Sequence, residues 1–267
     1  MAKFTCNFIS YTLKRTVDIT VIIPSVTIPE SMGMTLPEGQ KPRHQKADKY
    51  PVLYLLHGMG NNHAQWTGYT NVELFAEEQN MAVVMLSAEN KSYVNIYADN
   101  FYDFVSEELP DFVKEMFPIS DRPEDTYIAG LSMGGFGTLV HALSHPERFA
   151  AFGAFSAAVQ LNPYSLAGDA EADKHPINPA YDPMSLLKTD IEAGKKLPKM
   201  YVACGENDFL YEANKAFVEE MKALGCEVEV DFVPGYTHEW RFWNLEVEKF
   251  LNWIPRTDAY AGGKRQV

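Results

Sequence analysis

The stretch TYIAGLSMGGFG, residues 126–137, decides the predicted fold. It begins with a short apolar run typical of a buried strand and leads into a pattern typical of a helix. At the junction, Gly130, Ser132 and Gly134 form the only G-x-S-x-G motif in the chain. A serine on such a sharp turn needs neighbours without side chains, and its Oγ then stands clear of the sheet above a helix N-terminus. An ordinary glycine-rich turn is the alternative, but the flanking patterns favour a nucleophilic serine.

Short, nearly continuous apolar runs lie on both sides of this motif. Such runs are typical of strands covered on both faces in a parallel sheet. They span residues 52–56, 81–86, 126–129, 150–155 and 200–204, with a sixth, more alternating run at 227–233. Helical patterns lie between or after them, at residues 100–117, 136–143, 212–224 and 239–253. This alternation predicts βαβ units and a right-handed, doubly wound α/β sheet.

Three further segments complete what we expect to be a single domain over residues 1–267. Period-two runs at residues 4–12 and 16–23 predict an antiparallel pair of strands. Residues 25–50 collect Pro, Gly and Lys without a period and are expected to form an exposed loop. Residues 157–198 contain five prolines and no strand pattern, so they predict an inserted cap or lid.

Composition limits the classes of partner. The 267 residues are 46% hydrophobic and 22% charged, which is ordinary for a globular protein. The net charge of −13 opposes binding to phosphate backbones and anionic bilayers, so we expect neither a nucleic-acid nor a membrane partner. Three scattered cysteines give no disulfide framework, and no run reaches the ~18 apolar residues of a membrane span. The N-terminus lacks a signal-peptide pattern, so a cytoplasmic location is expected, and self-association stays open.

A serine hydroxyl needs a base to take its proton and an acid to orient that base. In folds built on this motif, the chain order is serine, acid, histidine. Of the seven histidines, only His238 follows an acid at the end of a later strand, so we predict His238 as the base. Asp208, in the loop after the run 200–204, is the predicted acid. Glu206 and Asp182 remain as alternative acids.

The oxyanion formed by attack on a carbonyl needs preorganised donors. One is expected to be the backbone N–H of Met133, directly after the serine. The other is predicted at Met59, in the loop after the run 52–56. Most aromatic residues near these loops are expected in the core, while Trp66 and Trp240 are predicted to line an acyl or alcohol pocket.

Two histidine pairs raise the alternative of a metal site. His57 and His63 have no third ligand at a metal-like spacing. His141 and His145 have the i, i+4 spacing of a zinc pair but lack the glutamate of H-E-x-x-H, and Pro146 ends their helix. For His141 and His145, packing or helix capping is the favoured interpretation, and we expect no metal and no cofactor.

Several motifs occur together between about residues 50 and 255. They are HGMG at 57–60, Trp66, SEELP at 106–110, GLSMGG at 130–135, HPERF at 145–149, and Gly235, His238 and Trp240 in the pattern G-x-x-H-x-W. This set resembles the esterases of the α/β-hydrolase superfamily that are related to tributyrin esterase. The broader group includes feruloyl and acetylxylan esterases, S-formylglutathione hydrolases and mycolyltransferases.

The resemblance implies an α/β-hydrolase fold, with a mostly parallel sheet, an antiparallel N-terminal part and helices on both faces. It also implies that Ser132, His238 and Asp208 hydrolyse short-chain carboxylic esters without a cofactor. The expected substrate is a small ester with an acetyl to butyryl group, including acetylated or feruloylated carbohydrates.

Three alternatives stay open. The first is a thioesterase like the S-formylglutathione hydrolases. Those enzymes usually have a histidine before the nucleophile and another after the glycines, where this sequence has Leu131 and Phe136. An acyltransferase would use the same acyl-enzyme with an alcohol as acceptor. A non-catalytic binding protein on a hydrolase scaffold is the third alternative, although such a protein has no use for a complete triad.

Overall fold

The core of the protein is one eight-stranded sheet, in a computed structural model that describes residues 1–34, 44, 46–175 and 178–261. The strand order is β1-β2-β4-β3-β7-β8-β9-β10. The bounds are Ala2–Ser10 (β1), Arg15–Ile23 (β2), Val52–Leu56 (β3), Ala82–Leu86 (β4), Thr126–Leu131 (β7), Ala151–Phe155 (β8), Lys199–Gly205 (β9) and Val228–Val233 (β10). Strand β2 pairs antiparallel with β1 and β4, and the other pairs are parallel. The predicted α/β fold with an antiparallel N-terminal part is therefore confirmed.

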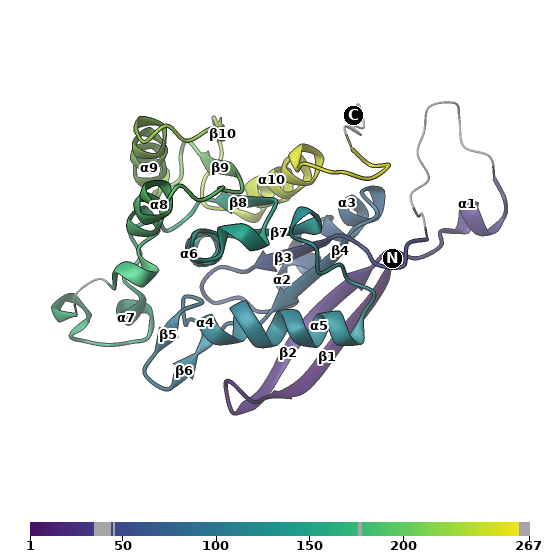
Figure 1. Cartoon of the computed structure of the whole chain (residues 1–267), viewed down its shortest axis with the longest axis horizontal. Coiled ribbons are helices and arrows are strands. Elements are labelled where there is room, and N and C mark those ends of the chain that lie inside the picture. Colours follow the sequence, from purple (N-terminus) through teal and green to yellow (C-terminus); the bar gives the residue numbers. More distant parts are fainter. Residues whose placement is uncertain (35–43, 45, 176–177, 262–267) are drawn as a thin grey trace.

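Helices cover both faces of this sheet, and Figure 1 shows the hairpin β1–β2 at one edge and β9, β10 and α9 at the other. One face packs against Phe101–Asp103 (α4), Leu109–Met116 (α5), Met133–Ser144 (α6), Pro183–Glu192 (α8) and Tyr211–Ala223 (α9). The other packs against Gln65–Tyr69 (α2), Val72–Glu78 (α3) and Trp240–Trp253 (α10). In β3, Val52, Tyr54 and Leu56 face the first layer, and Leu53 and Leu55 face the second. This two-sided burial explains why the central strands are continuous apolar runs.

The long helix predicted at residues 100–117 is divided by a π-helical turn, Phe104–Glu108, between α4 and α5. Pro110 follows this turn and has no N–H to donate to the Ser106 carbonyl four residues earlier. Arg148 replaces the missing donor, because its Nη1 lies 2.6 Å from that carbonyl oxygen. Two of the motifs behind the family resemblance, SEELP and HPERF, therefore meet in a structural contact.

In its described part, the loop expected over residues 25–50 contains the short helix Ile28–Ser31 (α1), which projects away from the sheet in Figure 1. This helix was not predicted; it begins at a capping box formed by Thr27 and Glu30, in which the Thr27 amide donates to Glu30 Oε2 at 2.8 Å. Residues 35–43 and 45 lie outside the described part of the chain. Helices α2 and α3 were also missed.

The segment 157–198 contains short Pro163–Leu166 (α7) and then α8. Helix α8 lies between the parallel strands β8 and β9 in sequence and packs against α6, so it is the ordinary crossover helix of this part of the sheet. The additional segment is thus the part before α8, of which residues 176–177 lie outside the description. A cap or lid role for it stays a prediction. A small hairpin, Asn95–Ile96 (β5) and Asp99–Asn100 (β6), lies after β4.

Across the described ranges, no helix combines the length and apolar character that crossing a bilayer requires.

Candidate active site

Ser132 lies on the turn between β7 and α6, as the sequence predicts. Its backbone has φ 55° and ψ −115°, a conformation that costs a non-glycine residue about 1–3 kcal/mol. A side chain on Gly130 would collide with the Gly134 carbonyl, and one on Gly134 would lie 2.5 Å from the Leu56 carbonyl. The strained turn is therefore possible only because both flanking positions of the motif are glycine.

Asp208 and His238 lie together in the loops that follow β9 and β10. The Oδ2 atom of Asp208 is 2.8 Å from Nδ1 of His238, and the Asp208 side chain is completely buried. The other carboxylate oxygen accepts the Leu210 amide at 2.9 Å. Because the carboxylate accepts, the His238 proton is on Nδ1, which leaves Nε2 free to act as a base. Strands β7 to β10 are parallel, so their carboxyl ends lie along the same side of the sheet. Ser132, which follows β7, is therefore on the same side as Asp208 and His238, which follow β9 and β10.

The two alternative acids make no contact with His238. Glu206 is exposed to solvent. Asp182 caps α8, because its carboxylate accepts the Ser185 amide at 2.8 Å. Of the three acids that the sequence suggested, the structure brings only Asp208 to the histidine.

Ser156, which the sequence analysis did not identify, supports this acid. Burial raises the pKa of the Asp208 carboxyl, but the hydrogen bonds with His238 and the Leu210 amide, together with the nearby Ser156 hydroxyl, lower it by more, so the pKa lies below its ordinary value. Ser156 directly follows β8, is buried and has φ 43°. Its Oγ accepts from Nε1 of Trp243 at 3.3 Å, and the Trp243 ring packs edge-on against His238. In the sequence, the only indication that Ser156 belongs to the site is its position directly after the predicted parallel strand at residues 150–155.

The two predicted oxyanion donors lie at the beginning of α6 and in the loop after β3. Met133 is the first residue of α6, and Met59 follows β3. For residues that the structure describes, neither amide has an intramolecular hydrogen-bond acceptor. Gly58 packs directly against the nucleophile turn, since a side chain there would lie 2.5 Å from Leu131 Cδ1.

His57 orients the Met59 amide. Its Nδ1 lies 2.7 Å from the Gly58 carbonyl oxygen, and its Nε2 accepts the Ala88 amide at 2.9 Å, so the proton is on Nδ1. Burial lowers the pKa of His57 to about 4, which keeps the ring neutral. The Gly58 carbonyl and the Met59 N–H belong to one planar trans peptide. The ring that holds this carbonyl therefore also fixes the direction of the N–H.

The other histidines are engaged in hydrogen bonds. Nδ1 of His63 lies 2.7 Å from the Thr20 hydroxyl, Nε2 of His141 2.9 Å from the Tyr93 carbonyl, and Nε2 of His145 3.0 Å from the Tyr102 hydroxyl. In the described part of the chain, no three His, Cys, Asp or Glu residues are grouped as metal ligands. These contacts agree with the packing and capping roles favoured by the sequence.

The two predicted pocket tryptophans differ in exposure. Trp66 is completely buried and donates from Nε1 to the Leu56 carbonyl at 3.1 Å, so it has no surface to offer a substrate. Trp240 is half-buried, stacks on exposed Tyr69 at 5.1 Å and lies edge-on to Trp66. Exposed Phe209 lies 4.7 Å from the His238 ring, between centroids. Of the predicted pair, only Trp240 can contact a substrate in this conformation.

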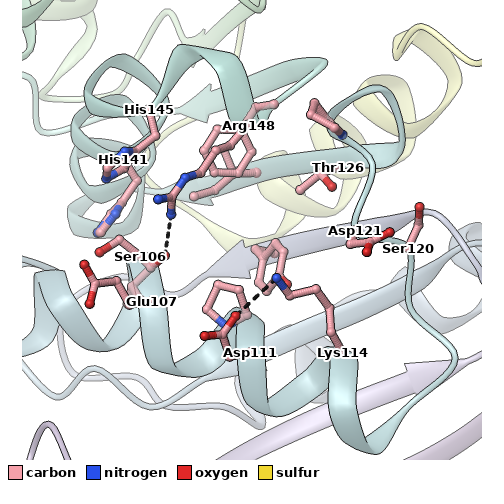
Figure 2. Close-up of a pocket in the computed structure, with 16 residues that line it drawn as sticks. Ser106, Glu107, Asp111, Lys114, Ser120, Asp121, Thr126, His141, His145 and Arg148 are labelled. Atoms are coloured by element: carbon pink, nitrogen blue, oxygen red, sulfur yellow. Dashed lines mark hydrogen bonds and ion pairs between the residues drawn. The ribbon is translucent and has the colours of Figure 1, made fainter.

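The cavity in Figure 2 has a volume of about 450 Å³ and lies away from these residues. Its lining includes Thr126, the first residue of β7, and His141 and His145 near the end of α6. Ser132 lies at the opposite ends of both elements, and no sequence-predicted site residue lines the cavity. Arg148 reaches across it to the Ser106 carbonyl (Figure 2).

A strained serine between a parallel strand and a helix, with a buried Asp–His pair at the same sheet edge, defines the serine hydrolases of the α/β-hydrolase class. Within this class the chain belongs to the esterase family described as "Putative esterase", whose profile matches residues 30–255. This confirms the esterase group indicated by the sequence motifs.

Individual relatives are similar over nearly the whole chain. An acetyl esterase of Caldicellulosiruptor saccharolyticus is 28% identical over 96% of this chain and 99% of its own length. The substrate-bound fluorophosphonate-binding serine hydrolase F of Staphylococcus aureus has a TM-score of 0.79 and 27% identity, covering 94% of this chain and 97% of its own. An S-formylglutathione hydrolase of the same organism has a TM-score of 0.79 and 28% identity, covering 94% and 95%. The protein is therefore a carboxylic ester hydrolase of the serine esterase type.

Proposed function

We propose that the protein hydrolyses short-chain carboxylic esters with Ser132 as nucleophile, His238 as base and Asp208 as the orienting acid. The observation that carries this assignment is the 2.8 Å contact between Asp208 Oδ2 and His238 Nδ1, at the sheet edge where β7 ends in the strained Ser132. The backbone amides of Met59 and Met133 are the proposed oxyanion donors.

The reaction follows from these positions. Ser132 Oγ attacks the ester carbonyl while its proton passes to His238 Nε2. The negative charge on the tetrahedral carbonyl oxygen is stabilised by the two amides, each of which contributes about 2.7–4 kcal/mol in comparable sites. Collapse releases the alcohol, which takes the proton from His238. Water then attacks the acyl-enzyme and gives one proton to His238, and the carboxylic acid leaves as His238 passes that proton to Ser132 Oγ.

An acetyl to butyryl acyl group is the proposed preference. The similarity to an acetyl esterase supports it.

An S-formylglutathione hydrolase activity is the second candidate, because one similar structure is such an enzyme. Leu131 and Phe136 occupy the positions where those hydrolases usually have histidines, and both side chains are buried here. We therefore rank the carboxylic ester above the glutathione thioester. The test is to measure kcat/KM for S-formylglutathione and for p-nitrophenyl acetate. A higher value for the thioester would reverse this ranking.

The central experiment is Ser132→Ala, assayed on p-nitrophenyl acetate, butyrate and hexanoate and on methyl ferulate. We expect turnover and labelling by a fluorophosphonate probe to disappear in the variant, and wild-type activity to fall beyond butyrate. Ser31→Ala, an exposed serine on α1, is the matched control and should keep full activity. Activity of Ser132→Ala close to that of the wild type would refute the assignment. Exclusive acyl transfer to an added alcohol in water would instead favour an acyltransferase.

A further inference from the structure

Tyr93 lies in the loop after β4 and is completely buried. Its backbone has φ 63°, and Ser92 before it has φ 57°. Two successive non-glycine residues in the left-handed region are strained and persist only where the surroundings require them. The contacts of Tyr93 indicate what this strain maintains.

The hydroxyl of Tyr93 donates to the His57 carbonyl at 2.8 Å. No other donor to that carbonyl is found among residues 1–34, 44, 46–175 and 178–261. Burial raises the pKa of Tyr93 well above its ordinary value, so the hydroxyl keeps its proton. The His57–Gly58 peptide is therefore held by Tyr93, and the next peptide, Gly58–Met59, is held by the His57 ring. Together the two contacts fix both peptide planes that precede the Met59 N–H.

The rest of Tyr93 contacts helix α6. Its backbone carbonyl lies 2.9 Å from Nε2 of His141, a helix residue labelled in Figure 2. Burial lowers the pKa of His141 to about 4, so this ring is neutral and Nε2 carries the donated proton. The Tyr93 ring lies over Gly137, where a side chain would be 2.6 Å from ring atom Cδ2. Gly137 is one turn beyond Met133, the first residue of the same helix.

One buried side chain thus connects the two elements that carry the proposed oxyanion donors. We propose that Tyr93 is a positioning residue of the oxyanion hole, holding the Met59 loop and helix α6 at the spacing where both amides reach one oxygen. This inference rests on the proposed function. A donor pair stabilises the transition state only if both N–H groups are in place before the charge develops.

The test is Tyr93→Phe, which keeps the ring and removes only the hydroxyl. We expect kcat for p-nitrophenyl acetate to fall about 10- to 100-fold, less than the roughly 10²–10³ for complete loss of a donor, with KM almost unchanged. The affinity for an alkyl trifluoromethyl ketone should fall by the same factor, because Ser132 adds to its carbonyl and leaves a negative oxygen in the hole. All rates are divided by the concentration of sites titrated with a fluorophosphonate.

Tyr127→Phe is the matched control. Tyr127 is also completely buried, and its hydroxyl donates to the Glu124 and Pro255 carbonyls, close to where β7 begins. Both variants should lose stability, but only Tyr93→Phe should lose kcat and ketone affinity. Gly137→Ala gives a second approach, since its methyl group would push the Tyr93 ring from the helix side and should lower kcat in the same way.

The outcomes separate the two proposals. If Tyr93→Phe keeps wild-type kcat and ketone affinity while it loses as much stability as Tyr127→Phe, Tyr93 is only a core residue and this inference is wrong. If the wild-type protein itself shows neither ester hydrolysis nor fluorophosphonate labelling, the proposed function is wrong instead.

Discussion

Nδ1 of His238 lies 2.8 Å from Oδ2 of Asp208, although 30 residues separate them along the chain. The carboxylate selects the tautomer in which Nε2 is unprotonated and can accept a proton. Asp208→Asn would present an amide to Nδ1 and favour the wrong tautomer. We expect kcat for p-nitrophenyl acetate to fall by about 10³–10⁴-fold.

The controls for this variant are the two rival acids. Glu206→Gln and Asp182→Asn should leave kcat unchanged, because neither side chain contacts His238 and asparagine also caps a helix well. A loss of activity in Glu206→Gln comparable with that in Asp208→Asn would overturn the assignment of the acid.

Removing the Ser156 hydroxyl should make the ionised form of the Asp208 carboxyl less stable. We expect Ser156→Ala to lower kcat about tenfold, the equivalent of roughly 1.4 kcal/mol, because the hydroxyl helps to lower the pKa of Asp208. Ser156→Gly separates activity from folding, because glycine also lacks the hydroxyl but relieves the positive φ of 43°. It should be at least as stable as the alanine variant in a urea titration and equally slow. Full activity in Ser156→Gly would show that the hydroxyl has no role.

Glu246 should make stability depend on pH. Burial and the charge of Asp231 raise the pKa of Glu246 to about 7 from its ordinary value of 4.5, against the opposing effect of Lys249. Between these two pH values the folded protein keeps a proton that the unfolded chain has released. The contribution of this proton to the free energy of unfolding is fully present below pH about 4.5 and is lost as the pH rises to about 7. Relative to wild type, Glu246→Gln should gain thermal stability over this interval. A stability difference independent of pH would contradict the shifted pKa.

Arg148 should matter for stability and not for catalysis. Arg148→Ala leaves the Ser106 carbonyl without the donor that Pro110 cannot supply, so we expect a loss of about 1–2 kcal/mol in the free energy of unfolding. Activity at 25 °C should not change, because Arg148 lies at the opposite end of α6 from Ser132. Arg148→Lys keeps one donor and should recover part of the stability. A large fall in kcat would instead connect this region to the active site.

Much of the fold was predictable because its signals are local. The runs at 52–56, 126–129 and 150–155 coincide with β3, β7 and β8, or with parts of them, because strands buried on both faces must be apolar at every position. Helices α2 and α3 were missed because they are short: α2 buries only Trp66, and α3 has room for a single apolar turn, Val72, Phe75 and Ala76. The π-helical turn was also missed, and the donor to its Ser106 carbonyl comes from Arg148, about forty residues away.

The sequence by itself determined the elbow at Ser132, since Gly130 and Gly134 are close neighbours and exclude side chains where the turn needs space. It also narrowed the candidate base to His238. Only the tertiary structure decided that Asp208, and not Glu206 or Asp182, contacts that histidine. The same holds for Ser156 and Tyr93, which gain their partners when distant loops pack at one edge of the sheet. A turn depends on residues a few positions apart, whereas a hydrogen bond between loops depends on the register and packing of all the strands that carry them.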